Sequence, residues 1–158
     1  MALTKGYKAP QFTLENTEGD EVSITDYRGQ TVLLLFFPLA FSSVCTKELC
    51  TTRDNMKLYE AFNTEVVAVS VDSFFTLKEF KKSQNLNFTL LSDFNKEVSR
   101  EYDVLYEDYF GMKGVAKRAA FLIDQGGTIQ HSQVLDDSGK LPDFDAILDV
   151  LKNLSTKY

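Results

Sequence analysis

The sequence predicts an α/β fold with a central mixed β-sheet, flanking helices and an N-terminal β-hairpin. Two observations lead to this fold class. Short, nearly continuous apolar segments, typical of strands buried on both faces, alternate with longer segments whose apolar residues recur at helical spacing. The hydrophobic share of 44% in 158 residues is enough to build a large core. We therefore expect one domain over residues 1–158.

The first half of the chain predicts a hairpin, two strands and two helices. Residues 12–24 (FTLENTEGDEVSI) have the pattern of a β-hairpin that turns around a glycine. Residues 31–37 (TVLLLFF) form the first buried strand, and residues 64–72 (TEVVAVSVD) form the second. Between them, residues 44–63 carry an imperfect apolar stripe that predicts a helix. Residues 75–84 predict a short helix after the second strand.

The second half continues the alternation and ends in a helix. Residues 88–93 predict a short strand and residues 95–102 a short helix. Residues 118–124 (RAAFLID) form a third apolar strand, which a Gln-Gly-Gly turn connects to a strand over residues 128–135 in an antiparallel pair. Residues 141–154 predict the last helix, with a proline near its start. The resulting order β-α-β-α-β-β-α is typical of an α/β sandwich.

Charge and cysteine content exclude several classes of protein. With 17 Lys and Arg against 23 Asp and Glu, the net charge is −6, which argues against nucleic acid and anionic membranes as partners. No apolar run approaches the ~18 residues of a membrane-spanning helix, and the N-terminus lacks the apolar centre of a secretory signal. We therefore expect a cytoplasmic protein. Two cysteines in such a chain are more often catalytic, metal-binding or core residues than a permanent disulfide.

A metal site is not expected. Structural zinc sites usually have four Cys or His ligands, whereas this chain offers Cys45, Cys50 and a single distant histidine, His131. His131 lies in a segment that alternates like a strand, where a solvent-facing or hydrogen-bonded histidine is the expected state. No motif for a bound cofactor is apparent, so we predict neither a metal nor a cofactor.

Cys45 follows the strand of residues 31–37 and lies at the start of the next helix, where open α/β sheets place their functional sites. Only about 3% of an ordinary thiol is thiolate at pH 7. The unpaired N–H groups and the dipole at a helix N-terminus stabilise the anion. Pro38 fixes the preceding loop. The alternative is that Ser42 or Ser43 only caps the helix, while Cys45 is a small buried apolar residue.

The segment PLAFSSVC resembles the Pro-x-x-x-Thr/Ser-x-x-Cys motif of peroxiredoxins. Pro38, Ser42 and Cys45 occupy the proline, hydroxyl and peroxidatic-cysteine positions of that motif. The segment KRAAFLIDQGG resembles the strand of the family that carries the active-site arginine, which would be Arg118, and Glu48 matches a family glutamate. The resemblance covers nearly the whole chain. It implies a thioredoxin-like fold and reduction of hydrogen peroxide or alkyl hydroperoxides through a cysteine sulfenic acid.

Cys50 determines which peroxiredoxin subgroup the chain resembles. Most motifs resemble the AhpE-type one-cysteine enzymes, but CTKELC has the Cys-x-x-x-x-Cys spacing of the bacterioferritin-comigratory (PrxQ) group. That spacing implies that Cys50 resolves the sulfenic acid as a disulfide. Five positions on one helix separate Cα atoms by roughly 8.6 Å, and disulfides rarely span more than about 7 Å. Resolution by Cys50 therefore requires unwinding; alternatively, Cys50 is a core residue and an external thiol resolves Cys45.

The resemblance also implies roles for the other motif residues. Arg118, a permanent cation, would stabilise the leaving oxygen of the peroxide. The Ser42 hydroxyl would accept a hydrogen bond from the peroxide while donating one to the thiolate. Glu48 would hold the arginine by a charge-assisted bond. The alternatives are a surface ion pair for Arg118 and a solvated helix position for Glu48. Arg53 and Asp54 are either a further support or an exposed pair.

Partners follow from the same resemblance. It implies a thiol reductant, such as thioredoxin or a glutaredoxin-like protein, and a homodimer. Clustered aromatic residues in loop-like segments favour an interface, although they could instead cover the core of their own domain; they are Phe74, Phe75, Tyr106, Tyr109 and Phe110. Two other classes stay open: a thioredoxin-type oxidoreductase, for which Cys-x-x-Cys is lacking, and a non-enzymatic redox sensor or holdase.

Overall fold

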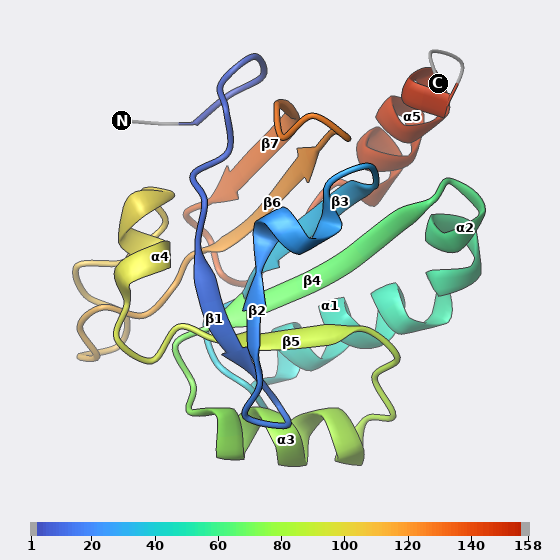
Figure 1. Cartoon of the computed structure of the whole chain (residues 1–158). Coiled ribbons are helices and arrows are strands. Elements are labelled where there is room, and N and C mark those ends of the chain that lie inside the picture. The colour runs from blue at the N-terminus through green and yellow to red at the C-terminus, as the bar shows by residue number, and fades with distance from the viewer. Residues whose placement is uncertain (1–2, 156–158) are drawn as a thin grey trace.

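The computed structural model of the chain describes residues 3–155, so residues 1–2 and 156–158 of the expected domain lie outside the described part. Seven strands and several helices alternate along the chain (Figure 1). The elements are β1 (Thr13–Asn16), β2 (Glu21–Ser23), the 3₁₀ helix η1 (Ile24–Tyr27), β3 (Thr31–Phe36), α1 (Ser43–Asp54), α2 (Met56–Ala61), β4 (Thr64–Ser70), α3 (Phe74–Ser83), β5 (Thr89–Ser92), α4 (Glu97–Glu101), β6 (Arg118–Ile123), β7 (Ile129–Leu135) and α5 (Phe144–Ser155).

The sheet is mixed, as the sequence predicts. Its strand order is β2-β1-β5-β4-β3-β6-β7. Strands β3, β4 and β5 are parallel, whereas β6 pairs antiparallel with β3 and β7 antiparallel with β6. The N-terminal hairpin adds β1 and β2 beside β5, both antiparallel to their neighbours. Because β6 runs against β3, the start of β6 lies at the sheet edge where β3 ends.

Each face of the sheet carries its own core. One face, called here the α1 face, packs against α1, α2, α3 and α5 through strand residues such as Leu33 and Leu35. The other face, called the α4 face, packs against α4 and η1 through residues such as Leu34 and Phe36. Adjacent strand residues point to opposite faces, which explains why β3 is apolar along its whole length. Arg118 shares the α1 face with Ala120, two positions further along β6.

The predicted helix over residues 44–63 is divided into α1 and α2. Asn55 separates them with φ −104° and ψ 9°, outside helical geometry. Its side-chain amide donates to the Thr51 carbonyl (3.1 Å), and its backbone N–H donates to the Thr52 carbonyl (3.1 Å). Asparagine side chains compete with helical hydrogen bonds in this way. The prediction of one continuous helix over residues 44–63 is therefore wrong at Asn55, where α1 ends and after which α2 begins.

His131 corrects a second expectation. Its partner across the β6–β7 pair is Leu122, so its side chain lies on the α1 face, which α5 also covers. Nε2 is buried and has no hydrogen-bond partner among the described residues. The expectation of a solvent-facing or hydrogen-bonded histidine is therefore wrong for this atom. Burial lowers the pKa of His131, and the negative charge of Asp143 partly opposes that shift.

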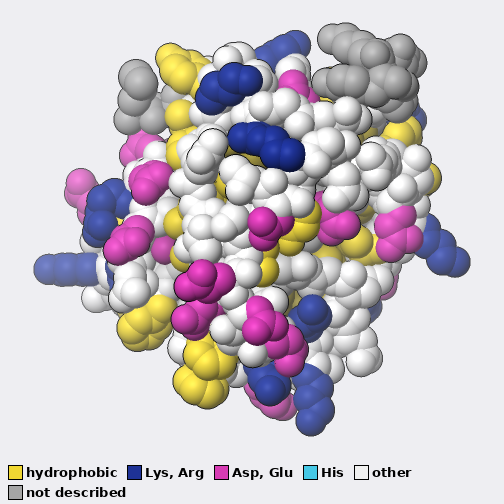
Figure 2. Space-filling model, viewed as in Figure 1, with side chains coloured by type: hydrophobic (Ala, Val, Ile, Leu, Met, Phe, Trp, Pro, Cys, Tyr) yellow, Lys and Arg dark blue, Asp and Glu magenta, His cyan; other side chains and the backbone are white. Residues whose placement is uncertain are grey.

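The surface reflects the negative net charge. In the view of Figure 2, acidic side chains gather over the region where Figure 1 has the N-terminal hairpin and β5, with separate apolar patches beside them. A cavity of about 450 Å³ lies in this region, and its lining includes Glu15, Glu21, Phe74, Phe75 and Phe94. Within residues 3–155, no helix has both the length and the apolar character needed to cross a bilayer.

Candidate active site

Cys45 lies where β3 leads into α1. It is the third residue of α1, whose N-cap, Ser42, has extended backbone angles. The Cys45 side chain is 1% exposed and packs in the core of the α1 face. Pro38, two residues after β3, is buried as well. The thiol therefore sits in the first helical turn, as predicted, and is enclosed by the protein.

The loop between β3 and α1 is held by the neighbouring strand. The Ala40 N–H donates to the Asp72 carboxylate (2.8 Å), and the Ser70 hydroxyl donates to the same oxygen (2.7 Å). Phe41 has a φ of +67°, a left-handed conformation that is unfavourable for a bulky residue. Its ring packs edge-on against Phe80, with 5.0 Å between the centroids. These contacts fix the turn that directs the chain into α1.

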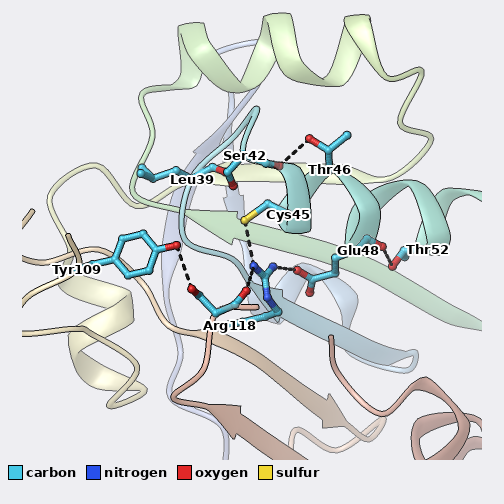
Figure 3. A network of polar contacts seen from close by, with 9 residues as sticks. Leu39, Ser42, Cys45, Thr46, Glu48, Thr52, Tyr109 and Arg118 are labelled. Carbon is cyan, nitrogen blue, oxygen red and sulfur yellow. Dashed lines mark hydrogen bonds and ion pairs between the residues drawn. The ribbon is translucent and has the colours of Figure 1, made fainter. Parts of the chain in front are cut away.

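Arg118 connects β6 to this site. Its side chain is 1% exposed, and Nη2 lies 3.4 Å from the Sγ of Cys45. Nη1 forms an ion pair with the carboxylate of Glu48, which is fully buried one helical turn after Cys45. Figure 3 shows the guanidinium between the sulfur and the carboxylate. The structure therefore brings Cys45, Glu48 and Arg118 together, and the alternatives of a surface pair and a solvated glutamate do not hold.

Burial dominates the electrostatics of this ion pair. Removal from water raises the pKa of Glu48 to about 7, although the charge and hydrogen bond of Arg118 oppose the shift. Burial also disfavours the Arg118 cation, but the charges of Glu48 and Cys45 outweigh that effect and raise its pKa. Arg118 is therefore a permanent cation next to a carboxylate that gains a proton close to neutral pH.

Ser42 is oriented differently from the sequence-based expectation. Its Oγ donates to the carbonyl of Leu39 (2.7 Å), within the loop, so its proton is not directed to Cys45. The carbonyl of Ser42 accepts hydrogen bonds from both the N–H and the Oγ1 of Thr46, each at 2.9 Å. In this state Ser42 closes the loop onto the first turn of α1. Its hydroxyl must rotate before it can donate to a thiolate or a bound peroxide.

Cys50 lies on the same helix as Cys45, and neither cysteine is in a disulfide. It is partly exposed, and its Sγ contacts the side-chain oxygen of Gln84 (3.5 Å) at the end of α3. Arg53 donates to the Gln84 carbonyl (2.6 Å) and pairs with Asp54 (2.9 Å), which is largely exposed. Arg53 and Asp54 therefore belong to the surroundings of Cys50 and are not part of the Arg118 ion pair.

Two contacts of the site were not anticipated from the sequence. The carbonyl of Ser138 accepts a hydrogen bond from Arg118 Nη2 (3.0 Å), and the Oγ of Ser138 accepts one from the hydroxyl of Tyr109 (3.1 Å). Ser138 acts through a backbone group in a loop, which no residue pattern indicates. The sequence marks Tyr109 only as a candidate interface residue. Across residues 3–155, no group of three or more His, Cys, Asp or Glu is placed to hold a metal ion.

Comparison with known proteins identifies the family. Residues 5–132 match the AhpC/TSA family. The chain is 38% identical over 153 residues to "Peroxiredoxin Bcp" of Escherichia coli (strain K12), which covers 95% of this chain and 96% of that protein. It is 36% identical over 129 residues to "Peroxiredoxin Q, chloroplastic" of Oryza sativa subsp. japonica, covering 82% and 58% of the two chains.

Solved structures agree with this placement. The reduced 2-Cys peroxiredoxin of Plasmodium vivax is 32% identical, with a TM-score of 0.86 over 98% of this chain and 84% of that one. Peroxidoxin BcpB of Mycobacterium tuberculosis, at 24% identity, has the same fold, with a TM-score of 0.87 over 96% and 98% of the chains. The names Bcp and peroxiredoxin Q belong to the subgroup that the sequence resembles at Cys45 and Cys50. The chain therefore belongs to the AhpC/TSA family and is a thiol peroxidase, a peroxiredoxin with a thioredoxin-like fold.

Proposed function

We propose that Cys45 is the peroxidatic cysteine and that Arg118, Glu48, Ser42 and Pro38 form its active site. The observation that carries this proposal is the buried guanidinium of Arg118, 3.4 Å from the Cys45 sulfur and paired on its other side with Glu48. A buried cation requires partners, and here they are the Glu48 carboxylate, the Cys45 thiol and the Ser138 carbonyl. This arrangement suits a reaction in which the thiol ionises and negative charge then moves onto oxygen.

The first step is attack of the Cys45 thiolate on one oxygen of the peroxide. The S–O bond forms as the O–O bond breaks, so sulfur is oxidised by two electrons and the peroxide is reduced by two. The leaving oxygen gains a proton and departs as water or as an alcohol. Cys45 becomes a sulfenic acid, since the attacked oxygen remains on sulfur.

Arg118 stabilises charge during this step. Nη2 is close enough to interact with the thiolate before attack and with the oxygens that carry charge during it. Glu48 fixes the guanidinium plane from the other side. Pro38 and the extended backbone of Ser42 place the first N–H groups of α1 beside the thiol. The Ser42 hydroxyl joins the reaction by turning away from the Leu39 carbonyl.

Cys50 then resolves the sulfenic acid. Its thiol attacks the Cys45 sulfur, a Cys45–Cys50 disulfide forms, and the hydroxyl leaves as water. Both residues lie on the intact α1, where ideal geometry separates their Cα atoms by roughly 8.6 Å, so the first turns must open. The alternative is that Cys50 keeps its contact with Gln84 and an external thiol resolves Cys45.

Substrate and reductant are assigned only by class. A peroxide is the oxidant, and hydrogen peroxide or an alkyl hydroperoxide fits a site flanked by the apolar Leu39 and Phe41. A thiol protein of the thioredoxin or glutaredoxin-like kind is the proposed reductant. The proposed compartment is the cytoplasm, and the proposed unit is one domain over residues 1–158.

The proposed assembly is a homodimer. Phe75 is 71% exposed and Phe110 is 85% exposed, and both belong to the aromatic segments that the sequence singled out. Tyr106 and Tyr109, by contrast, stack on each other with 4.9 Å between their centroids and bond to a neighbouring loop. Sedimentation at micromolar concentration tests the dimer, and a species of 17.9 kDa alone would contradict it.

Two measurements test the chemistry: the stopped-flow rate at which hydrogen peroxide oxidises the protein, and the intact mass of the oxidised product. A rate far above that of a free thiol supports the enzyme, whereas a rate close to it favours the sensor or holdase. After one equivalent of peroxide, a loss of two hydrogens indicates the Cys45–Cys50 disulfide. A gain of one oxygen indicates a stable sulfenic acid that an external thiol must resolve.

A further inference from the structure

Residues 105–116 form a short hairpin beside the active site, called here the tyrosine hairpin. Backbone hydrogen bonds join Tyr109 and Met112 in both directions (2.8 and 2.9 Å), and a second bridge pairs Leu105 with Ala116. Phe110 and Gly111 turn the chain with φ values of +52° and +84°, the positive φ values of a type I′ turn. The hairpin therefore has a defined conformation although its tip is exposed.

Two tyrosines of this hairpin hold the loop that follows β7. Tyr106 donates from its hydroxyl to the Asp136 carbonyl (2.7 Å), and Tyr109 donates to Ser138 Oγ (3.1 Å). The two rings stack, so they act as one rigid unit. Lys117 adds an ion pair with the Asp136 carboxylate (3.0 Å). This loop is otherwise largely exposed, since Asp136, Asp137, Gly139 and Lys140 all face solvent.

The loop in turn reaches Arg118. The carbonyl of Ser138 accepts a hydrogen bond from Nη2 (3.0 Å), the same nitrogen that lies 3.4 Å from Cys45 Sγ. This nitrogen carries two hydrogens in the guanidinium plane. When one is bound to the Ser138 carbonyl, the other is directed to the sulfur. Figure 3 shows the connection running from Tyr109 through an intervening residue to Arg118.

We propose that Tyr109 and Ser138 are positioning residues for the peroxidatic reaction. The Tyr109 hydroxyl fixes Ser138, and the Ser138 carbonyl fixes the rotation of the Arg118 guanidinium relative to Cys45. This inference rests on the proposed role of Arg118. The ion pair with Glu48 holds Nη1 but still allows the guanidinium to rotate about that contact. Nε does not restrain this rotation, since it has no hydrogen-bond partner within residues 3–155. The contact with Ser138 supplies the second point that defines the plane.

Four variants test the connection. Tyr109→Phe removes only the donated hydrogen bond, and Ser138→Ala removes only its acceptor and keeps the carbonyl. Each is expected to slow Cys45 oxidation by hydrogen peroxide about fivefold, the rate equivalent of one net hydrogen bond. The double variant is expected to be no slower than either single variant, because both remove the same bond. Ser138→Thr, which restores a hydroxyl, is expected to recover the wild-type rate.

A second readout separates positioning from general loosening. The reaction with peracetic acid releases acetate, which is a weaker base than hydroxide and needs less stabilisation by a cation. Tyr109→Phe should therefore slow this reaction less than the reaction with hydrogen peroxide. The matched control is Tyr102→Phe, which removes a bond of 2.7 Å to the Pro10 carbonyl on the α4 face. It should lower thermal stability at least as much as Tyr109→Phe while leaving the peroxide rate unchanged.

Several results would overturn the proposal: wild-type rates in both single variants, multiplicative losses in the double variant, or equal losses with both oxidants. Arg118→Met distinguishes failure of this inference from failure of the proposed site. If Arg118→Met is slow and the Tyr109 and Ser138 variants are normal, only the positioning role is wrong. If Arg118→Met reacts at the wild-type rate, the role assigned to the arginine is wrong as well.

Discussion

Arg118 Nη2 and Cys45 Sγ lie 3.4 Å apart, although 73 positions separate the two residues in the chain. The contact joins the first residue of β6 to the first turn of α1. It forms because β6 runs antiparallel to β3, which brings the start of one strand to the end of the other. The cation is thus held by a strand that is buried along its whole length, and the thiol by the helix that follows its equally buried neighbour.

Cys45→Ser is expected to abolish peroxide reduction, because a serine hydroxyl supplies no anionic nucleophile near neutral pH. Cys50→Ala should leave the first oxidation step within about twofold of wild type, since the Cys50 side chain contacts Gln84 and not the Arg118 site. Stopped-flow measurement of the first step and steady-state turnover with a thiol reductant check both. Equal loss of the first step in the two variants would mean that the roles are assigned wrongly.

Arg118→Met should slow the first step by about a hundredfold or more, the effect of removing one charge-stabilising donor. Stopped-flow kinetics with hydrogen peroxide provide the measurement. Arg100→Met, which changes an exposed arginine on α4, is the matched control and should retain wild-type values. An unchanged rate in Arg118→Met contradicts the assignment.

Glu48 should make the reduced protein less stable as pH rises. Its pKa of about 7 in the folded state lies above the ordinary carboxyl value, so the folded state holds a proton that the unfolded state has released. Between the ordinary carboxyl pKa and about pH 7, the contribution of this group to the free energy of unfolding falls as pH rises. Denaturant unfolding of wild type and Glu48→Gln at several pH values measures the difference. A wild-type slope equal to the variant's would contradict the raised pKa.

His131 acts in the opposite direction. Burial lowers its pKa, so the folded state resists protonation, and the stability contributed by the neutral ring is lost as pH falls below the ordinary histidine value. His131→Leu should remove this loss, because leucine matches its cross-strand neighbour Leu122 and leaves no orphaned nitrogen. The difference in unfolding free energy between variant and wild type should grow as the solution is acidified. A difference independent of pH would show that the ring titrates normally.

Oxidation should open the start of α1. If Cys45 and Cys50 form a disulfide, their Cα atoms must approach by about 2 Å or more from the helical separation. Backbone amides of α1 should then exchange with solvent faster in the oxidised protein than in the reduced one. Hydrogen exchange with mass spectrometry measures this, and the amides of α5 serve as an internal reference. Equal protection of α1 in both states, with the disulfide confirmed by mass, would show that the helix need not unwind.

The parts of the fold that follow from repetitive patterns were predictable. The buried strands β3 and β6 both appear as apolar runs, the second opened by a single charged residue, Arg118. The joining of these two segments did not follow from periodicity, which indicates a strand without naming its neighbour. That step came from the resemblance to peroxiredoxins.

Other features depend on contacts that leave no pattern. The division at Asn55 arises from one side-chain hydrogen bond competing with the helix. The orientation of the Ser42 hydroxyl is set by a nearby carbonyl, that of Leu39. Ser138 enters the site through its backbone, so its identity carries no information about its contact with Arg118.

The pairing of Phe36 with Ala119 has a further consequence for how this chain tolerates change. Alternate residues of β6 face opposite layers, so inserting a single residue after Arg118 would turn its side chain from the α1 face to the α4 face. The strand could still pair with β3 and remain apolar, and the protein could still fold. It would then carry an intact thiol with no cation beside it. In this fold, the register of a strand matters for catalysis as much as the identity of its side chains, because the register decides which face of the sheet Arg118 occupies.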